Sequence, residues 1–220
     1  MVQVREQTLK SIYMTRGVVG MVVVQLVLLI AVDEVVLADS PLWKKHIVQK
    51  SRGTSGQVNT VVANDLDKDG NVDLLGSFDG KVVLYRGPDW DATEILAEMP
   101  ADQTGRVAQR GCIHSTLMDV DGDGDLDYVG SNRMLFWLEC PTKPFVDRWI
   151  CRTISLDVNG AHCVITGDVD RDGKLDLIAN SWRDRGASRV PNSITWLAVP
   201  DAPQAAGLWR PNVFANGDAP

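Results

Sequence analysis

Three nine-residue stretches decide the fold of this chain: 65-DLDKDGNVD-73, 119-DVDGDGDLD-127 and 168-DVDRDGKLD-176. All three fit the pattern D-x-D-x-D-G-x-x-D, and they begin 54 and 49 residues apart. Thirteen of the 29 acidic residues fall inside these stretches, whereas outside them 16 acidic residues face 19 basic ones. The net charge of −7 is therefore local to the three loops. A nucleic-acid partner, which would need a basic face, is not expected.

Carboxylates this close in sequence repel one another unless a cation lies among them. Hard oxygen ligands at this density suit Ca²⁺, which accepts about six to eight of them. Glycine at the sixth position allows a sharp turn around the ion. The seventh residue can add a backbone carbonyl, and the apolar eighth residue is expected to anchor the loop to the core. The predicted calcium ligands are Asp65, Asp67, Asp69, Asn71 and Asp73; Asp119, Asp121, Asp123, Asp125 and Asp127; and Asp168, Asp170, Asp172, Lys174 and Asp176.

Two alternatives to these calcium loops can be weighed from the sequence. An EF-hand needs a glutamate at the twelfth position and a helix on each side. Here the twelfth position holds Gly76, Gly130 and Ala179, and the flanking residues are typical of strands. An aspartate-rich turn without an ion is the other alternative, and three such loops in register argue against it.

The sequence around the loops repeats with a period of about fifty residues. One short apolar stretch precedes each loop, and two more follow it. The last of these stretches ends in an aromatic residue, with a proline shortly after it, and a tryptophan begins each unit. Such β-branched and aromatic stretches, bounded by Gly, Asp, Asn and Pro, are typical of strands. We therefore predict an all-β partial propeller with a four-stranded blade in each unit. The predicted blades are residues 43–88, 90–141 and 149–200, with an incomplete fourth from residue 209.

Over about residues 43–200, the loops and their spacing resemble the FG-GAP/VCBS calcium-loop repeats of integrin-like β-propellers. The resemblance implies an extracellular or cell-surface propeller in which each blade holds a Ca²⁺ in an inter-strand loop. By position, it implies the aspartates at loop positions one, three, five and nine as ligands. Closed propellers generally need about four to eight blades. With three loops, the chain resembles a truncated member of the family, or an array that self-associates to complete a propeller.

The N-terminus has the pattern of a secretory signal. Residues 1–16 carry three basic residues and one acidic residue, residues 17–32 are apolar except for Gln25, and Val36-Leu37-Ala38 offers small residues for cleavage. The apolar run is shorter than the ~20 residues that span a bilayer comfortably, and an uncleaved membrane anchor is the alternative to cleavage. Residues 1–38 are therefore predicted to be a signal peptide or anchor. Residues 39–220 are predicted to be secreted, periplasmic or at the cell surface.

Four cysteines remain in the exported part, and their even number permits two disulfides. Cys140 and Cys151 flank a short connection, while Cys112 and Cys163 occupy nearly matching places in successive repeats. These two pairs are favoured, with free thiols as the alternative.

These features favour a non-catalytic module in which Ca²⁺ stiffens the loops and the blade faces bind an extracellular protein or a carbohydrate. An enzyme acting on sugars, of lyase or dehydratase type, is the alternative. His114 and His162 carry it, because inner strands of neighbouring blades would bring them to one channel. Most tryptophans are expected in the cores between blades, and Trp182 is the candidate for an exposed functional one. A truncated fragment without independent function is the third hypothesis.

Overall fold

The computed structural model of the chain describes residues 45–49, 58–102, 104–107, 110–158, 161–181 and 193–216. Over these ranges the regular secondary structure consists of β-strands alone. No helix in the described part is long and apolar enough to cross a membrane. The predicted signal or anchor segment, residues 1–38, lies outside the described residues, as do Trp43 and Trp182. The fold is therefore all-β, as the sequence predicts.

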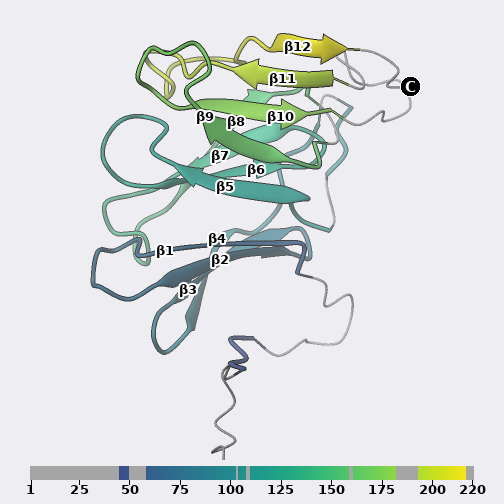
Figure 1. Ribbon diagram of the computed structural model, residues 1–220. Coiled ribbons are helices and arrows are strands. Elements are labelled where there is room, and N and C mark those ends of the chain that lie inside the picture. Colours follow the sequence, from purple (N-terminus) through teal and green to yellow (C-terminus); the bar gives the residue numbers. More distant parts are fainter. Residues whose placement is uncertain are drawn as a thin grey trace, which may run out of the picture. The chain divides into compact units, whose positions relative to one another are not determined.

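The strands form three four-stranded antiparallel sheets, each with its strands in chain order (Figure 1). The first sheet contains β1 (Thr60–Asn64), β2 (Asp73–Phe78), β3 (Lys81–Arg86) and β4 (Asp91–Leu96). The second contains β5 (His114–Met118), β6 (Asp127–Ser131), β7 (Leu135–Glu139) and β8 (Ile150–Ser155). The third contains β9 (Val164–Gly167), β10 (Asp176–Asn180), β11 (Ser193–Leu197) and β12 (Asn212–Asn216).

Each aspartate loop connects the first strand of a sheet to the second, and its ninth residue begins the second strand. In the first sheet, the second strand then turns back into the third through Asp79 and Gly80, whose φ angles are 49° and 76°. Two consecutive residues with positive φ are typical of the type I′ turn, which matches the twist of a two-residue hairpin. Because each loop joins the first strand of its sheet to the second, the aspartate loops occupy the same position in all three sheets.

The fourth strand of each sheet lies beyond the blade boundary expected from the sequence. β4, β8 and β12 follow Trp90, Trp149 and Trp209, which the sequence analysis placed at the start of the next unit. The sheets span residues 60–96, 114–155 and 164–216, so the residues after 209 complete the third sheet. In every sheet the fourth strand pairs antiparallel with the third, and in the first sheet the connection between them is tight. In the first sheet the N–H of Trp90 donates to the carbonyl of Arg86 at 2.6 Å, which returns β4 onto β3.

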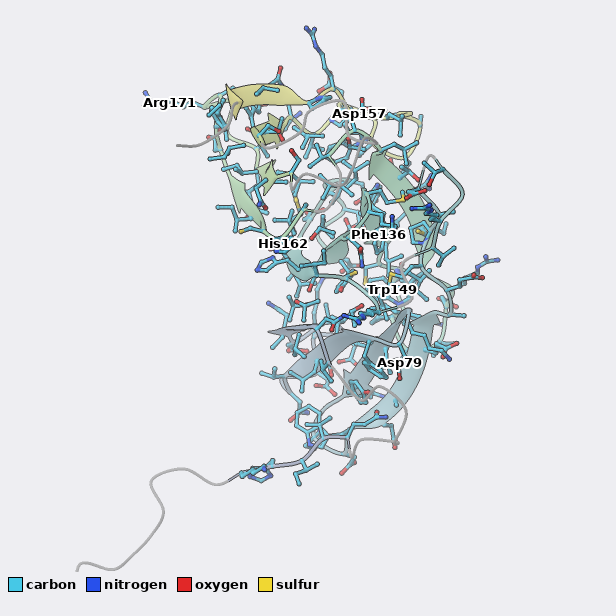
Figure 2. All side chains as sticks on the ribbon, turned by 90° about the vertical axis from the view of Figure 1, so that its right-hand side faces the viewer. Asp79, Phe136, Trp149, Asp157, His162 and Arg171 are labelled. Atoms are coloured by element: carbon cyan, nitrogen blue, oxygen red, sulfur yellow. The ribbon has the colours of Figure 1, made fainter. Side chains whose placement is uncertain are left out.

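Two hydrophobic cores lie between successive sheets. The first joins the first and second sheets and includes Phe136 and Trp149, which are labelled in Figure 2. The second joins the second and third sheets and includes Trp137 and Trp209. The expected burial of tryptophans is confirmed at these three positions, because Trp137, Trp149 and Trp209 are each at most 4% exposed.

The first core leaves no room for a side chain at Gly130 on β6. A Cβ added there would lie 2.6 Å from Cζ of Phe136 and 2.7 Å from Sγ of Cys112. A Cβ at Gly167, by contrast, would meet Cδ1 of Ile178 at an ordinary 3.5 Å.

We predict that Gly130→Ala lowers the free energy of unfolding by about 1–3 kcal/mol, because overpacking forces the neighbouring side chains to shift. Gly167→Ala is the matched control, since neither glycine has a positive φ. The control should change stability by about 0.5 kcal/mol or less. Urea denaturation followed by tryptophan fluorescence measures both, and equal stability of the two variants would contradict the packing described.

Candidate metal sites

The three loops bring together their first, third and ninth aspartates. In each loop, one carboxylate oxygen from each of these residues lies within 4.8 Å of the other two. Oxygens that share one large divalent cation lie at most about 5 Å apart, because each metal–oxygen bond is about 2.3–2.6 Å long. Each group can therefore hold a metal ion. The groups are Asp65, Asp67 and Asp73; Asp119, Asp121 and Asp127; and Asp168, Asp170 and Asp176.

The ninth aspartates, Asp73, Asp127 and Asp176, are 0%, 1% and 2% exposed. In each loop the backbone N–H of the second residue donates to Oδ2 of the ninth, at 2.9, 2.8 and 2.9 Å in chain order. In the first two loops Oδ1 accepts another N–H from just beyond the third strand, from Gly87 at 2.9 Å and from Cys140 at 2.7 Å. This carboxylate therefore fastens the loop to the hairpin that follows it.

The first and fifth aspartates shape the turn itself. Asp65 accepts the N–H groups of Asp69 and Gly70 at 3.0 and 2.9 Å, and the corresponding bonds form in the second loop. The fifth aspartate of every loop accepts the N–H of the seventh residue at 2.8 Å. Asp69, Asp123 and Asp172 lie outside the groups of three. Their part as ligands stays a prediction, as does that of the carbonyls of Asn71, Asp125 and Lys174.

The sixth position of each loop requires glycine. Gly70, Gly124 and Gly173 all have a φ of 90°, a conformation that strains any residue with a Cβ. This common backbone turn is what allows the first aspartate to accept the N–H of the sixth residue.

The apolar residue that anchors each loop is not the one expected. The eighth residues Val72 and Leu175 are about half exposed, so that expectation is wrong for the first and third loops. The second residue is buried instead in the first two loops, at Leu66 and Val120. In all three loops the N–H of the second residue donates to the buried ninth aspartate, which holds this residue at the sheet, and in the first two loops a core between sheets then covers its side chain.

The electrostatics of the loops favour a bound cation. Oδ1 of Asp67 is buried and has no hydrogen-bond partner among the described residues. Burial raises the pKa of Asp127 to about 7, and the charges of Asp121 and Asp123 add to the effect. Burial likewise raises the pKa of Asp73 and of Asp176. A cation among these oxygens would offset the cost of the buried negative charge and satisfy the unpaired atom.

Sequence analysis missed Arg86, which lies beside the first loop. Its Nη2 is 2.7 Å from Oδ2 of Asp67 and 3.6 Å from Oδ2 of Asp69, and its guanidinium lies over the ring of Phe145. The sequence could have indicated Arg86 only through its position at the end of the predicted third strand, immediately before Gly87. At the equivalent place in the second sheet stands Glu139, which pairs with Arg152 at 2.7 Å. The surroundings of the first two loops therefore differ in charge.

The second loop contacts its neighbours on both sides. Nζ of Lys68, in the first loop, lies 2.8 Å from Oδ1 of Asp125. Nε2 of Gln204 donates to Oδ2 of Asp121 at 2.7 Å. Between the second loop, the third loop and residues 199–203 lies a pocket of about 410 Å³. Apolar side chains line it together with Asp119, Asp121, Lys174 and Asp201.

The two histidines considered for catalysis do not form one site through any described contact. Nδ1 of His114 accepts the N–H of Val164 at 3.3 Å, so this side chain joins β5 to β9. His162 is exposed and projects from the surface in Figure 2, while its backbone N–H donates to Asn180. His114 therefore has a structural partner at the boundary between two sheets.

All four cysteines are free thiols, so the favoured disulfides Cys112–Cys163 and Cys140–Cys151 are not formed. In each pair one cysteine is buried and the other is exposed, which keeps the sulfur atoms in different surroundings. Burial raises the pKa of Cys112 to about 11 and that of Cys140 to about 12. Both buried thiols are therefore protonated at neutral pH and unreactive.

The raised pKa of Asp127 predicts a pH dependence for the metal-free protein. A carboxyl with a pKa near 4 when unfolded and about 7 when folded contributes stability below about pH 4 that is lost as the pH rises through 7. In EDTA, this group should therefore make the protein less stable at pH 7.5 than at pH 5. Asp127→Asn should reduce that difference, although its NH2 group cannot accept an N–H and one of the two backbone hydrogen bonds is therefore lost. Asp125→Asn, outside the group of three, is the control, and thermal melts at both pH values provide the measurement.

We predict that Arg86→Gln strengthens divalent-cation binding at the first loop by roughly tenfold, because it removes a competing positive charge beside Asp67. Arg133→Gln is the matched control, since Arg133 pairs with Asp102 away from the loops. Isothermal titration calorimetry resolves the change. Unaltered affinity in the Arg86 variant would show that the guanidinium does not compete with the ion.

Comparisons with protein-family models and with curated proteins find no match for this chain. Its function is therefore argued from the geometry of the loops and the arrangement of the sheets.

Proposed function

We propose that this chain is an exported calcium-binding repeat protein of the FG-GAP/VCBS type that acts as a non-catalytic binding module. The observation that carries the proposal is the recurrence of one three-aspartate group at the same place in three sheets. A single acidic turn can arise without an ion. Three turns with the same buried ninth carboxylate and the same positive-φ glycine support a common ligand.

The ligand atoms favour calcium over other metal ions. All the side-chain donors in the groups are carboxylate oxygens, whereas zinc and copper sites usually include histidine or cysteine. Mg²⁺ demands near-ideal octahedral geometry at about 2.0–2.1 Å and keeps several waters. Ca²⁺ accepts flexible geometry and backbone carbonyls, which a nine-residue loop can supply. In each loop the ion would neutralise the buried carboxylates and hold the first strand to the second.

The packing of the first strands supports a propeller. Oγ1 of Thr60 on β1 lies 2.8 Å from Oγ of Ser115 on β5, and His114 of β5 accepts an N–H from Val164 of β9. The first strands of the three sheets are therefore neighbours, as are the innermost strands of blades around a propeller channel. We accordingly propose that the three sheets are propeller blades, with one calcium loop per blade.

The pocket beside the second loop supports a binding role. Its apolar lining with a few charged groups suits a protein segment or a carbohydrate, and two of its aspartates belong to the second metal group. A ligand there would contact a surface that the ion keeps rigid. The pattern of residues 1–38 supports export, which would expose the loops to a calcium-rich exterior.

Calcium should raise the melting temperature of the full-length chain, because a ligand that binds the folded state stabilises it in proportion to ln(1 + [Ca²⁺]/Kd). The triple variant Asp67→Asn, Asp121→Asn and Asp170→Asn should lose that effect. These third-position residues are suitable because the backbone hydrogen bonds that fasten each loop are accepted by the ninth aspartate, which the variant keeps. Differential scanning calorimetry with EDTA, Mg²⁺ or Ca²⁺ measures the shift.

The native chain in Mg²⁺ is the control for general ionic effects. A folded chain that melts at the same temperature in EDTA and in saturating Ca²⁺ would rule out the calcium assignment. Equal Ca²⁺ stabilisation of the native chain and the triple variant would place the ion elsewhere.

A further inference from the structure

The pocket beside the second loop has apolar walls and an excess of carboxylates. Its charged groups are the carboxylates of Asp119, Asp121 and Asp201 and the ammonium of Lys174. Nζ of Lys174 lies 3.2 Å from Oδ1 of Asp201, so these two charges offset each other. Leucine, methionine, valine and proline side chains supply the rest of the lining. The net charge of the pocket therefore comes from the first and third aspartates of the second loop.

The second loop is the most acidic of the three. It has five aspartates and no basic residue, whereas the first loop has four with Lys68, and the third has four with Arg171 and Lys174. Arg86 pairs with the first loop from outside and brings its formal charge to −2, which equals that of the third. One divalent cation would therefore neutralise the first and third loops and leave the second at −3. Lys68 also contacts Asp125, which offsets one of these charges.

The fourth loop position accounts for part of this difference. Lys68, Gly122 and Arg171 occupy it, with φ angles of 60°, 78° and 64°. Nζ of Lys68 extends to the second loop, where it donates to the carbonyl of Gly124 at 3.3 Å. Arg171 is exposed and is labelled in Figure 2. Gly122 lines the pocket and brings neither a side chain nor a charge to the same position.

The third aspartate of the second loop also lacks the basic partner of its counterpart. Oδ2 of Asp67 in the first loop lies 2.7 Å from Nη2 of Arg86, whose guanidinium lies over the ring of Phe145. Oδ2 of Asp121 accepts Nε2 of Gln204 instead, which is a neutral amide. The first loop thus shows how a guanidinium is held at such a site, with its charge on the aspartate and its flat face on an apolar surface.

The lining of the pocket favours a basic protein segment over a carbohydrate. Among the described residues that line it, none is aromatic, so it offers no ring on which a sugar could stack. A neutral sugar brings no charge to offset the carboxylates, and an acidic sugar would be repelled by them. Lysine and arginine combine an aliphatic stem with a cationic end, which matches apolar walls that bear carboxylates.

We propose that this pocket binds a segment of a partner protein that carries an arginine or a lysine between apolar residues. The basic group pairs with the carboxylates of Asp119 and Asp121, and the apolar residues lie against Leu175 and Val199, which line the same pocket. The inference rests on the binding role proposed above and specifies its partner. The second loop is negative with and without a divalent cation, so the segment binds in both states and more tightly without the ion.

The probe is a short fluorescein-labelled peptide of alternating leucine and arginine, compared with counterparts that carry glutamine or glutamate in place of arginine. Fluorescence anisotropy with the full-length chain measures binding in EDTA and in Ca²⁺. The arginine peptide should bind at least about tenfold more tightly than the glutamine peptide, because only its charge complements the pocket. High NaCl should weaken its binding by screening. Maltohexaose and an oligogalacturonate are added as competitors.

Gly122→Lys should weaken binding of the arginine peptide at least about tenfold, because it supplies at the pocket the basic side chain that the other two loops carry. A Cβ at Gly122 would meet no atom within 4 Å, and Lys68 and Arg171 show that this backbone accepts a side chain. Gly105→Lys is the matched control and should bind as the native chain does. Gly105 has a φ of 74° and equally open space, and it lies outside the pocket lining.

Asp201→Asn gives a second test that does not depend on the loop backbone. It removes the partner of Lys174 and leaves a positive charge in the pocket, so it should weaken binding by roughly threefold. Asp147→Asn is its control, because Asp147 is exposed on the corresponding connection of the second sheet, between β7 and β8. Circular dichroism confirms that each variant folds.

Weaker binding in Gly122→Lys and Asp201→Asn, with both controls unchanged, supports the proposal. Equal binding of the three peptides overturns it, and so does tighter binding of the glutamate peptide, including binding seen only in Ca²⁺. Binding that persists in both pocket variants, or falls equally in the controls, places the peptide elsewhere and also overturns it. Displacement of the arginine peptide by either oligosaccharide would assign the pocket to a carbohydrate. Failure of the calcium proposal would show instead as a melting temperature that Ca²⁺ does not change, with the peptide affinities intact.

Discussion

The buried carboxylate of the ninth loop residue is the constraint on which the sheets and their candidate metal sites both depend. It begins the second strand, accepts the N–H of the second loop residue, and in the first two loops accepts another from beyond the third strand. These bonds fix the loop, but they also draw a carboxylate out of water, which raises its pKa. The fold therefore leaves unbalanced negative charge where the ninth aspartate meets the first and third aspartates. A metal ion there is the simplest compensation for a cost that the hydrogen bonds impose.

The three loops share a backbone but not an electrostatic environment. The first contains Lys68 and faces Arg86, which pairs with Asp67. The second has five aspartates and lies beside Glu139. Burial raises the pKa of Asp121, and the negative charge of Glu139 raises it further. The third includes Arg171 and Lys174, and Lys174 pairs with the exposed Asp201. Coulombic attraction for a divalent cation is therefore strongest at the second loop, and the loops should fill in sequence rather than together.

The sequence was informative wherever local spacing determined the structure, and silent where distant contacts did. The D-x-D-x-D-G-x-x-D pattern predicted three equivalent turns between strands, because aspartate hydrogen bonds and a positive-φ glycine act within nine residues. The grouping of strands could not be read the same way, since β4 could pair with the preceding hairpin or open the next one. The sequence did not predict the contact of Arg86 with Asp67, because strand β2 and the rest of strand β3 separate the two residues along the chain. The sequence could not distinguish the second loop residue from the eighth as the anchor, because both are apolar. The hydrogen bond from the second residue to the ninth aspartate is visible only in three dimensions.

The same hydrogen bond connects the loops to the cores between the sheets. Leu66, the second residue of the first loop, lies in the core between the first and second sheets, and Val120 of the second loop lies in the next core. A cation bound at either loop would therefore stabilise a sheet–sheet boundary as well as a turn. Val169 is the counterpart in the third loop, and it is only partly buried, on a sheet that no further sheet covers among the described residues.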